Sequence, residues 1–389
     1  MNALIPLVSP LLPDIDDVIA DLRASHATGR LTNFGPFVRA FERRAAAILG
    51  VRHASTTCNA TTALEMLLDT LPQRCHVVVP SFTFPATAQA VTMRMRVPVF
   101  ADIDPETLNL APDSVEAAIT PKTRAILAVH AFGVPCPIAE LAEIAARRNL
   151  LLLFDAAHAF GSRYRGTYVG RFGDAEAFSI SATKVMPAGE GGLIATNSVR
   201  LHESMLDRRN YGYARDGSRD CRNQGWNAKL PEHNASLALR ELETLEERVR
   251  RRNEIAQRYL AGLAGVPGLR FQRVPGGDTS TYKDFTIQVD AARFGVSRDD
   301  LREALRAQAI ESEAYFWPPL HRMTFFRRYA RRGAPLPATE AVAGRILSLP
   351  LFEEMTEEQI DRVIAAVTEI GAASRMRRRV SVSAATVTA

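Results

Sequence analysis

The stretch that decides the fold is Phe178-Ser-Ile-Ser-Ala-Thr-Lys184-Val-Met-Pro-Ala-Gly189-Glu-Gly-Gly-Leu193. Its lysine follows the strand-like run from Ala175 to Ile180 and precedes a glycine-rich turn, in a small and weakly polar neighbourhood. An ammonium is unfavourable to desolvate, so such a setting lowers the pKa of a lysine and lets it act as an amine. The chemistry that needs such an amine most directly is Schiff-base formation with a carbonyl. An ordinary lysine at the end of a strand fits these residues equally well.

The composition is that of an ordinary globular protein, with 47% hydrophobic and 23% charged residues. A chain of 389 residues is long enough for two domains, or for one large domain with a smaller appendage. The net charge is +5, and four arginines of the segment 374–381 supply four of these charges, which leaves 5 − 4 = +1 for the rest. A nearly neutral body lacks the basic face of a nucleic-acid-binding protein, so we predict no nucleic-acid partner.

The cysteines and the N-terminus bear on the compartment. Cys58, Cys75, Cys136 and Cys221 form no C-x-x-C pair and have no histidines at metal-ligand spacing, which predicts reduced thiols and no metal site. The N-terminus has no cationic start and is interrupted by prolines, unlike a signal peptide. No apolar run approaches the roughly 20 residues that span a bilayer. We therefore expect a cytoplasmic protein without a membrane partner.

Strand-like and helix-like segments alternate through the first half of the chain, after an extended, proline-rich start and a helix at Pro36–Leu49. Several strands are continuous apolar runs, which is typical of strands buried on both faces of a largely parallel sheet. The fold class is therefore α/β, with ligand groups expected at the carboxyl ends of strands. The predicted strands are His76–Pro80, Val97–Ala101, Ala125–His130, Leu150–Phe154, Ala175–Ile180 and Gly192–Thr196, and the helices between them are Ala86–Met95, Asp113–Ile119 and Ile138–Arg148.

A long charged helix from Ala235 to about Ala264 leads into a second region that reads as a smaller α+β domain. We predict a large domain at residues 1–248, a small C-terminal domain at 249–373 and a disordered basic tail at 374–389. The elements predicted for the small domain are strands at Asp284–Val289 and Ile310–Phe316 and helices near Arg298–Gln308, Ala338–Leu347 and Thr356–Ile370.

Two polar groups point to a phosphate. The hydroxyl-rich turn Ser55–Asn59 leads into an amphipathic helix that begins near Ala60 and Thr61. Free N–H groups at such a helix start can hold a phosphate, although a plain N-cap explains the same residues. Ser179, five residues before Lys184, places a hydroxyl where it can reach a phosphate while the lysine reaches an aldehyde.

Three further side chains fall at strand ends and suit a flat, nitrogen-containing ring. Asp155 directly follows the most apolar strand and can pair with a pyridine nitrogen, or it can be a structural cap. His158 can bond to the same ligand or be a satisfied core histidine. Phe84 can stack on a ring or pack in the core. Together with the lysine and the phosphate groups, these residues indicate pyridoxal phosphate.

In this order the residues resemble the DegT/DnrJ/EryC1/StrS family of sugar aminotransferases, and the likeness covers nearly the whole chain. The family has the fold-type I structure of pyridoxal-phosphate enzymes, with a mostly parallel seven-stranded sheet flanked by helices and a smaller C-terminal domain. The segments that carry the resemblance are Gly35–Glu42, Asn59–Leu64, Pro80–Thr87, Pro98–Asp104, Ala128–Gly133, Asp155–His158, the lysine stretch through Gly189–Gly192, Gly225–Asn227 and Leu347–Thr356.

The resemblance implies a role for each site residue. Lys184 would form the Schiff base with pyridoxal phosphate and shuttle protons. The other cofactor contacts would be Asp155 at the pyridine nitrogen, His158 (glutamine in many relatives) beside the ring, Phe84 stacked on it, and Ala60, Thr61 and Ser179 on the phosphate. Asn227 would reach the phosphate from the neighbouring subunit of an obligate homodimer with shared active sites. His321 would line the substrate side.

Two positions depart from the family pattern. Lys229 stands where the family usually has arginine, which keeps the charge but loses the planar fork and leaves that substrate contact open. Ala60 stands where the family usually has glycine, and it still offers its backbone N–H. Neither change threatens the cofactor.

The implied reaction is amino transfer, because a dehydrating branch of the family carries histidine in place of Lys184. We expect L-glutamate to donate the amino group to a nucleotide-linked keto-deoxysugar, first of all to C4 of a dTDP-4-keto-6-deoxyhexose, in secondary-metabolite or glycan biosynthesis. A C3-keto sugar or an inosose remains open as acceptor. A catalytically inactive regulatory relative is the alternative of another class. A Rossmann dehydrogenase lacks support, because Gly189-Glu-Gly-Gly is no G-x-G-x-x-G after a strand.

Overall fold

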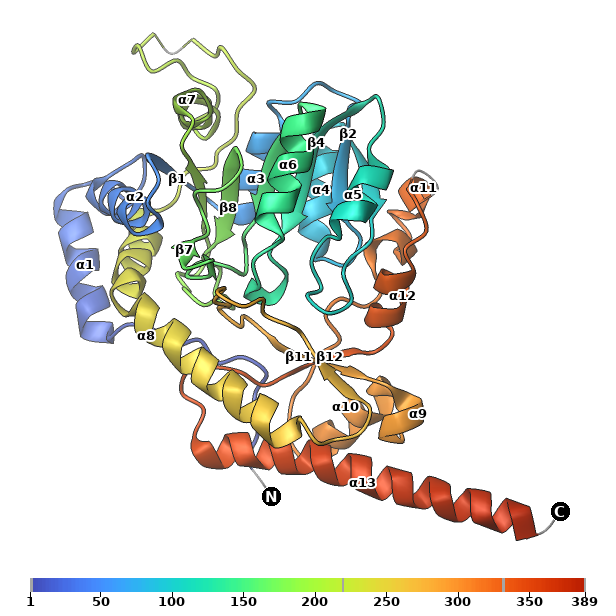
Figure 1. Ribbon diagram of the computed structural model, residues 1–389. Helices are drawn as coiled ribbons and strands as arrows, with labels where there is room; N and C mark the ends of the chain where they lie inside the picture. Colours follow the sequence, from blue (N-terminus) through green and yellow to red (C-terminus); the bar gives the residue numbers. More distant parts are fainter. Residues whose placement is uncertain (1–2, 219, 331–332, 388–389) are drawn as a thin grey trace.

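The computed structural model describes residues 3–218, 220–330 and 333–387. A seven-stranded sheet in the order β1-β9-β8-β5-β4-β2-β3 forms the centre of its larger part (Figure 1). Neighbouring strands are parallel from β8 to β3, and β9 is antiparallel to both β8 and β1. The predicted mostly parallel α/β sheet is confirmed. Its strands are β1 (His53–Thr57), β2 (His76–Pro80), β3 (Val97–Ala101), β4 (Thr123–Val129), β5 (Leu151–Asp155), β8 (Ala175–Ser179) and β9 (Gly192–Thr196).

The strands are apolar on both faces because helices cover both. Along β2, Val78 packs into one core while Val77 and Val79 pack into the other, as alternate strand residues must. The helices on the Val78 side are α2 (Pro36–Leu49), α5 (Pro112–Ala118), α6 (Ile138–Arg148) and the first half of α8 (Glu232–Leu263). The helices on the other side are α3 (Ala60–Leu68), α4 (Pro85–Met93) and α7 (Val199–Arg208). A two-stranded hairpin, β6 (Arg163–Tyr164) and β7 (Thr167–Tyr168), lies outside this sheet.

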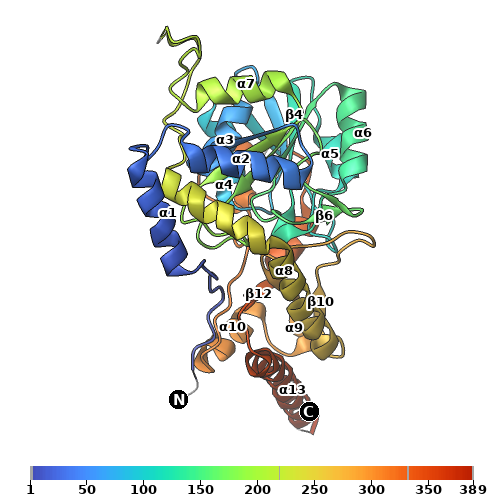
Figure 2. The same ribbon diagram turned by 90° about the vertical axis from the view of Figure 1, so that its left-hand side faces the viewer.

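The smaller part is built on a three-stranded antiparallel sheet, β10-β11-β12. Helix α8 runs from the large sheet into this part, as Figures 1 and 2 show. Its Val249 still packs in the core of the large part, whereas Ile255 already packs in the core of the small part. The elements of this region are β10 (Leu269–Phe271), β11 (Phe285–Val289), α9 (Ala291–Phe294), α10 (Arg298–Ala307), α11 (Arg327–Ala330), α12 (Pro337–Ala343), β12 (Ile346–Leu349) and α13 (Glu357–Val387).

The structure differs from the predicted domain limits at both ends of the chain. Ile5 forms a parallel bridge with Ile310 and is fully buried in the core of the small part, so the N-terminal segment does not belong to the large part alone. At the other end, α13 continues through Val387 instead of giving way to a disordered tail at 374. Its first half packs on α8, α9 and α10, and a helix that is already nucleated extends readily through alanine and arginine residues. No described helix has the length and apolarity that a membrane crossing requires.

Four other predictions about elements were wrong or incomplete. The turn predicted around Ser55 is strand β1. This strand is buried although its side chains are polar, because neighbouring residues satisfy them: Thr56 Oγ1 donates to Glu42 Oε1 at 2.8 Å. The N-terminal segment predicted as extended contains helix α1 (Ile15–Ala27), much of whose surface is exposed. Residues 310–316 form isolated bridges instead of a strand. The helix predicted to reach 347 ends at Ala343 and is followed by strand β12. Every residue of Ile346–Leu349 is buried, so the apolar pattern there does not have the period of a helix.

Candidate active site

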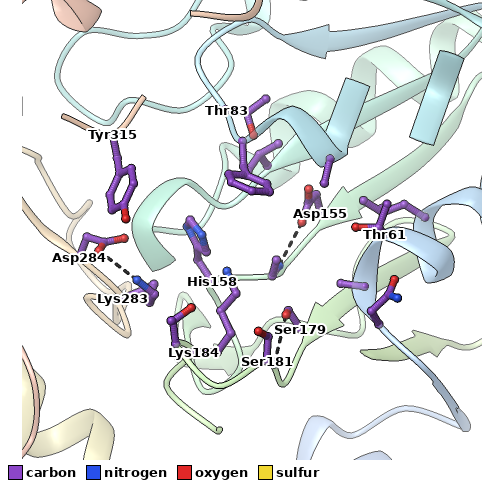
Figure 3. Close-up of a pocket in the computed structure, with 18 of the residues that line it drawn as sticks. Thr61, Thr83, Asp155, His158, Ser179, Ser181, Lys184, Lys283, Asp284 and Tyr315 are labelled. Carbon is purple, nitrogen blue, oxygen red and sulfur yellow. Dashed lines mark hydrogen bonds and ion pairs between the residues drawn. The ribbon is translucent and has the colours of Figure 1, made fainter. Parts of the chain in front are cut away.

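A cavity of about 340 Å³ lies at the carboxyl ends of the parallel strands and holds most of the predicted site residues. Figure 3 shows its side chains converging from the large sheet and from the small part. The large part lines the cavity with the ends of β4, β5 and β8 and with the starts of α3 and α4. The predicted residues on its wall are Ala60, Thr61, Phe84, Asp155, His158, Ser179 and Lys184.

One end of the cavity is a cradle of donors at the start of α3. The Asn59 side chain accepts from the Thr62 N–H at 2.8 Å and so caps the helix. The first-turn N–H groups of Ala60 and Thr61 have no intrahelical acceptor and are available to an anion. Opposite them, a side chain at Gly192 of β9 would come within 2.6 Å of the Asn59 backbone carbon, so glycine allows the strand to approach the helix start. The plain N-cap is therefore present, and the N–H groups beside it suit a phosphate.

Asp155 ends β5 and is 6% exposed. Its carboxylate accepts from Thr87 Oγ1 at 2.7 Å and from the Ala157 N–H at 3.1 Å. Burial raises its pKa, while these hydrogen bonds and the nearby Lys184 ammonium act in the opposite direction. A buried carboxylate of this kind favours a protonated nitrogen as its partner. Thr87, in the first turn of α4, was not predicted as a site residue, because a threonine there is typical of the exposed face of a helix.

His158 and Phe84 flank the same space. The Nδ1 atom of His158 is buried and has no hydrogen-bond partner among the described residues. Burial, followed by the charges of Lys184 and Lys283, lowers the pKa of His158 well below its usual value, so the imidazole is neutral. Phe84 precedes Pro85 at the start of α4 and is 58% exposed, unusual for a phenylalanine beside a cavity. A buried polar atom and an exposed ring both lack partners that a flat heteroaromatic ligand supplies.

Lys184 lies in the turn after β8, where its N–H donates to the Ser181 carbonyl at 2.9 Å. Burial lowers its pKa from 10.5 to about 8, and the Lys283 ammonium contributes in the same direction. Asp284, Asp155 and Glu190 partly oppose this shift. The neutral amine, which attack on an aldehyde requires, is therefore far more populated near neutral pH than in an ordinary lysine.

These residues fit pyridoxal phosphate. The helix start and Ser179 offer donors to the phosphate, Asp155 offers a carboxylate to the ring nitrogen, Phe84 offers a face to the ring, and Lys184 offers an amine to the aldehyde. All of them border one cavity, although they come from separate strands and helices.

The pKa of Lys184 gives a testable pH dependence. In the apoprotein we expect the rate of pyridoxal phosphate capture to rise with pH through a midpoint near 8, because the amine loses its proton there instead of near 10.5. Stopped-flow absorbance between pH 6.5 and 9.5 measures this. Lys283→Met removes a neighbouring cation and should move the midpoint upward. A wild-type midpoint near 10 would contradict the assignment.

Four residues from the second half of the chain complete the wall of the cavity and were missed by sequence reasoning. Lys283, Asp284, Tyr315 and Phe316 lie more than 90 residues beyond Lys184 in the chain. The local sequence gives no sign of a site at these residues, because a lysine–aspartate pair beside a strand is typical of a solvated surface. The packing of the small part against the large sheet brings them to the site.

Three predicted residues are not on the wall of this cavity. Lys229 donates to the Asn227 side chain, and its ammonium lies 4.3 Å from the centre of the Tyr211 ring. His321 uses both ring nitrogens elsewhere, with Nδ1 2.7 Å from Ser81 Oγ and Nε2 2.6 Å from a Glu340 carboxylate oxygen. The prediction that His321 lines the substrate side therefore finds no support within the chain, since its polar atoms already link α12 to the end of β2.

Comparison with known proteins agrees with this geometry. The sequence profile of the DegT/DnrJ/EryC1/StrS aminotransferase family matches residues 14–368. Spore coat polysaccharide biosynthesis protein SpsC of Bacillus subtilis (strain 168) is 31% identical over 382 residues, which are 95% of this chain and 97% of SpsC.

Solved structures agree as well. DesI, whose crystal structure was analysed in the presence of its TDP-sugar product, is 35% identical with a TM-score of 0.88, over 97% of this chain and 96% of DesI. The 3-amino-5-hydroxybenzoic acid synthase structure is 27% identical with a TM-score of 0.87, over 95% of this chain and all of that one (100%). This chain therefore belongs to the DegT/DnrJ/EryC1/StrS aminotransferase family and is a pyridoxal-phosphate-dependent sugar aminotransferase.

Proposed function

We propose that the enzyme transfers an amino group from L-glutamate to C4 of a dTDP-4-keto-6-deoxyhexose. The observation that carries the choice of a nucleotide sugar is the 35% identity to DesI, whose structure was analysed with its TDP-sugar product. The 31% identity to a spore coat polysaccharide biosynthesis protein also favours a sugar acceptor. The choice of C4 rests on overall likeness to the family.

The residues of the cavity divide the work of such a transfer. Bound pyridoxal phosphate supplies an aldehyde that carries the amino group and a ring that takes up electrons from the substrate carbon. Lys184 Nζ accepts the proton from the substrate carbon and returns it to the cofactor side, and it acts in both directions because its pKa lies near 8. Asp155 stabilises positive charge at the ring nitrogen. The neutral His158 offers a hydrogen bond without adding charge.

The proposal includes a homodimer in which Asn227 of each subunit reaches the phosphate of the other, with Lys229 beside it on the substrate side. Within one chain, Asn227 and Lys229 are off the cavity wall, which suits a role toward a second copy. The exposed apolar side chains Ile15, Ile19 and Leu22 of α1 are further candidates for burial between subunits.

Subunit mixing tests the shared site. Lys184→Ala and Asn227→Ala are each expected to be inactive or strongly impaired as pure proteins. After unfolding and refolding together at equal concentration, about a quarter of all sites should carry neither substitution, because half of the dimers are mixed and each mixed dimer has one intact site. Assays of amino transfer before and after mixing measure the recovery. No recovery, despite mixed dimers shown by mass spectrometry, would place Asn227 in its own subunit's site.

A panel of acceptors with L-glutamate, followed by mass spectrometry, tests the substrate. The C4-keto dTDP-sugar should give an amino sugar at the highest rate. Faster turnover of a C3-keto sugar would move the position of amination, and transfer to an inosose alone would overturn the nucleotide-sugar assignment. Wild-type protein that binds no pyridoxal phosphate would instead support the inactive, regulatory alternative.

A further inference from the structure

A buried ion pair from the small part, Lys283 with Asp284, faces the active-site cavity. Lys283 Nζ lies 3.0 Å from Asp284 Oδ1, and the two residues are 6% and 4% exposed. Figure 3 shows the pair on one side of Lys184, with Ser179 and Thr61 on the other. The pair therefore lies on the side of Lys184 away from the two residues predicted to hold the phosphate.

The backbone holds Lys283 rigidly just before β11. Its N–H donates to the Phe132 carbonyl at 3.0 Å, and its carbonyl accepts from Arg252 Nη2 at 3.0 Å. The backbone that carries this side chain is thus fixed by the turn after β4 through Phe132 and by α8 through Arg252. Such placement orients the ammonium toward the cavity before a ligand binds.

Stability alone gives little reason for this pair. Burying two charges carries a desolvation penalty that their mutual attraction often fails to offset, and an apolar pair of similar volume is frequently as stable. The chain has four lysines, at 122, 184, 229 and 283, against 44 arginines (48 − 4), and two of the four line this cavity. They are also the only cationic side chains among its described lining residues.

The two substrates bring different polar groups to the same pocket. A dicarboxylic amino donor brings carboxylates next to the reacting carbon, whereas the ring of a keto-deoxysugar brings hydroxyl groups and no charge there. Lys184 is committed to the cofactor and to proton transfer, so among the lysines on the cavity wall of one chain Lys283 is left to neutralise a carboxylate. A hydroxyl, in contrast, is an excellent donor to a carboxylate such as Asp284.

We propose that Lys283 and Asp284 form a subsite that serves both half-reactions, with Lys283 binding a carboxylate of the amino donor and Asp284 accepting a hydrogen bond from a ring hydroxyl of the acceptor. When the donor is bound, Asp284 competes with it for the same ammonium. When the donor has left, the ion pair reforms and presents Asp284 to the sugar. This inference rests on the proposed use of L-glutamate and a keto sugar.

The two half-reactions of the holoenzyme can be tested separately. In the donor half-reaction, Lys283→Met should raise the apparent Kd for L-glutamate, read from loss of the yellow absorbance, about 10–100-fold. Calorimetric titration of the holoenzyme with glutarate, which has two carboxylates and no amine, should weaken similarly. Asp284→Asn should leave these constants unchanged or lower them, because it removes the carboxylate that competes with the donor. Lys122→Met, at an exposed turn, is the matched control and should behave as wild type.

In the acceptor half-reaction, started from the amine form of the cofactor, Asp284→Asn should have the larger effect of the two substitutions. Asp284→Asn should raise the apparent Kd for the keto sugar about tenfold, and Lys283→Met should change it less. Equal losses from both variants in both half-reactions would mean a merely structural pair and overturn the subsite, as would unchanged glutamate and glutarate constants in Lys283→Met. A wild-type enzyme that ignores L-glutamate but reacts with an uncharged amine donor would overturn the proposed donor, and the subsite with it. A wild-type enzyme that uses L-glutamate while Lys283→Met does so equally well would overturn the subsite alone.

Discussion

Replacing Lys184 with alanine should reduce amino transfer by about 10⁴-fold, the largest loss expected of any single substitution in the chain. The amine is the group that both captures the cofactor aldehyde and carries the proton. Its half-buried position lowers its pKa to about 8, which lets one side chain act as base and as acid. Alanine offers neither function, and water in a buried cavity is a poor substitute. Steady-state assays with L-glutamate and the keto sugar measure the loss.

Chemical trapping locates the reaction. Borohydride should fix pyridoxal phosphate to wild-type protein at Lys184, and peptide mapping can exclude the three other lysines at 122, 229 and 283. Lys122→Ala, at an exposed turn, is the control and should keep its activity and its labelling. Labelling at a different lysine, or more than a few per cent of activity in Lys184→Ala, would contradict the assignment of the amine.

Replacing Asp155 with asparagine should lower the rate of transfer by about 10²–10³-fold, the loss typical of removing one preorganised charge from a buried site. The substitution preserves size and the acceptor for Thr87, but an amide does not stabilise a protonated ring nitrogen. Burial is the first cause of the raised pKa of Asp155 in the protein alone, and a positively charged partner opposes that effect. Rate assays together with equilibrium dialysis of pyridoxal phosphate separate lost catalysis from lost binding.

Asp174→Asn is a control at the opposite end of the same sheet, just before β8. Asp174 accepts from the Leu152 N–H at 2.8 Å, near the amino end of β5 and away from the cavity. Its substitution should leave catalysis nearly unchanged, because asparagine keeps an acceptor for the Leu152 N–H and touches no cavity group. If Asp174→Asn and Asp155→Asn lost activity equally, the effect at Asp155 would be due to folding and its proposed role would be wrong.

Much of the site follows from the sequence for a topological reason. In a parallel sheet, residues that directly follow separate strands meet at the same edge. Asp155 at the end of β5, Ser179 at the end of β8 and Phe84 soon after β2 therefore converge although they are far apart in the chain. The resemblance to the family added Asn227, Lys229 and His321, and within one chain their side chains bond to other residues away from the cavity wall.

The failures have physical causes as well. Strand β1 is rich in hydroxyl groups that its neighbours satisfy, as Thr56 is by Glu42, so apolar alternation does not reveal it. Strand β12 is buried on both faces, so its short apolar run cannot be told from a helix end by periodicity. Ile5 packs in the small part because a single apolar residue in an extended segment finds its partner, Ile310, 305 residues away.

By itself, the sequence determined the α/β class, six of the seven strands of the large sheet, and the lysine, the aspartate and the helix start that suit pyridoxal phosphate. Only the tertiary structure decided what surrounds them. It brought Lys283 and Asp284 of the small part to the cavity and placed Thr87 against Asp155. It also packed enough of the protein around Lys184 to bring its pKa to about 8. Local pattern records which face of an element is buried, whereas the pKa of an amine depends on every charge that packing brings near it.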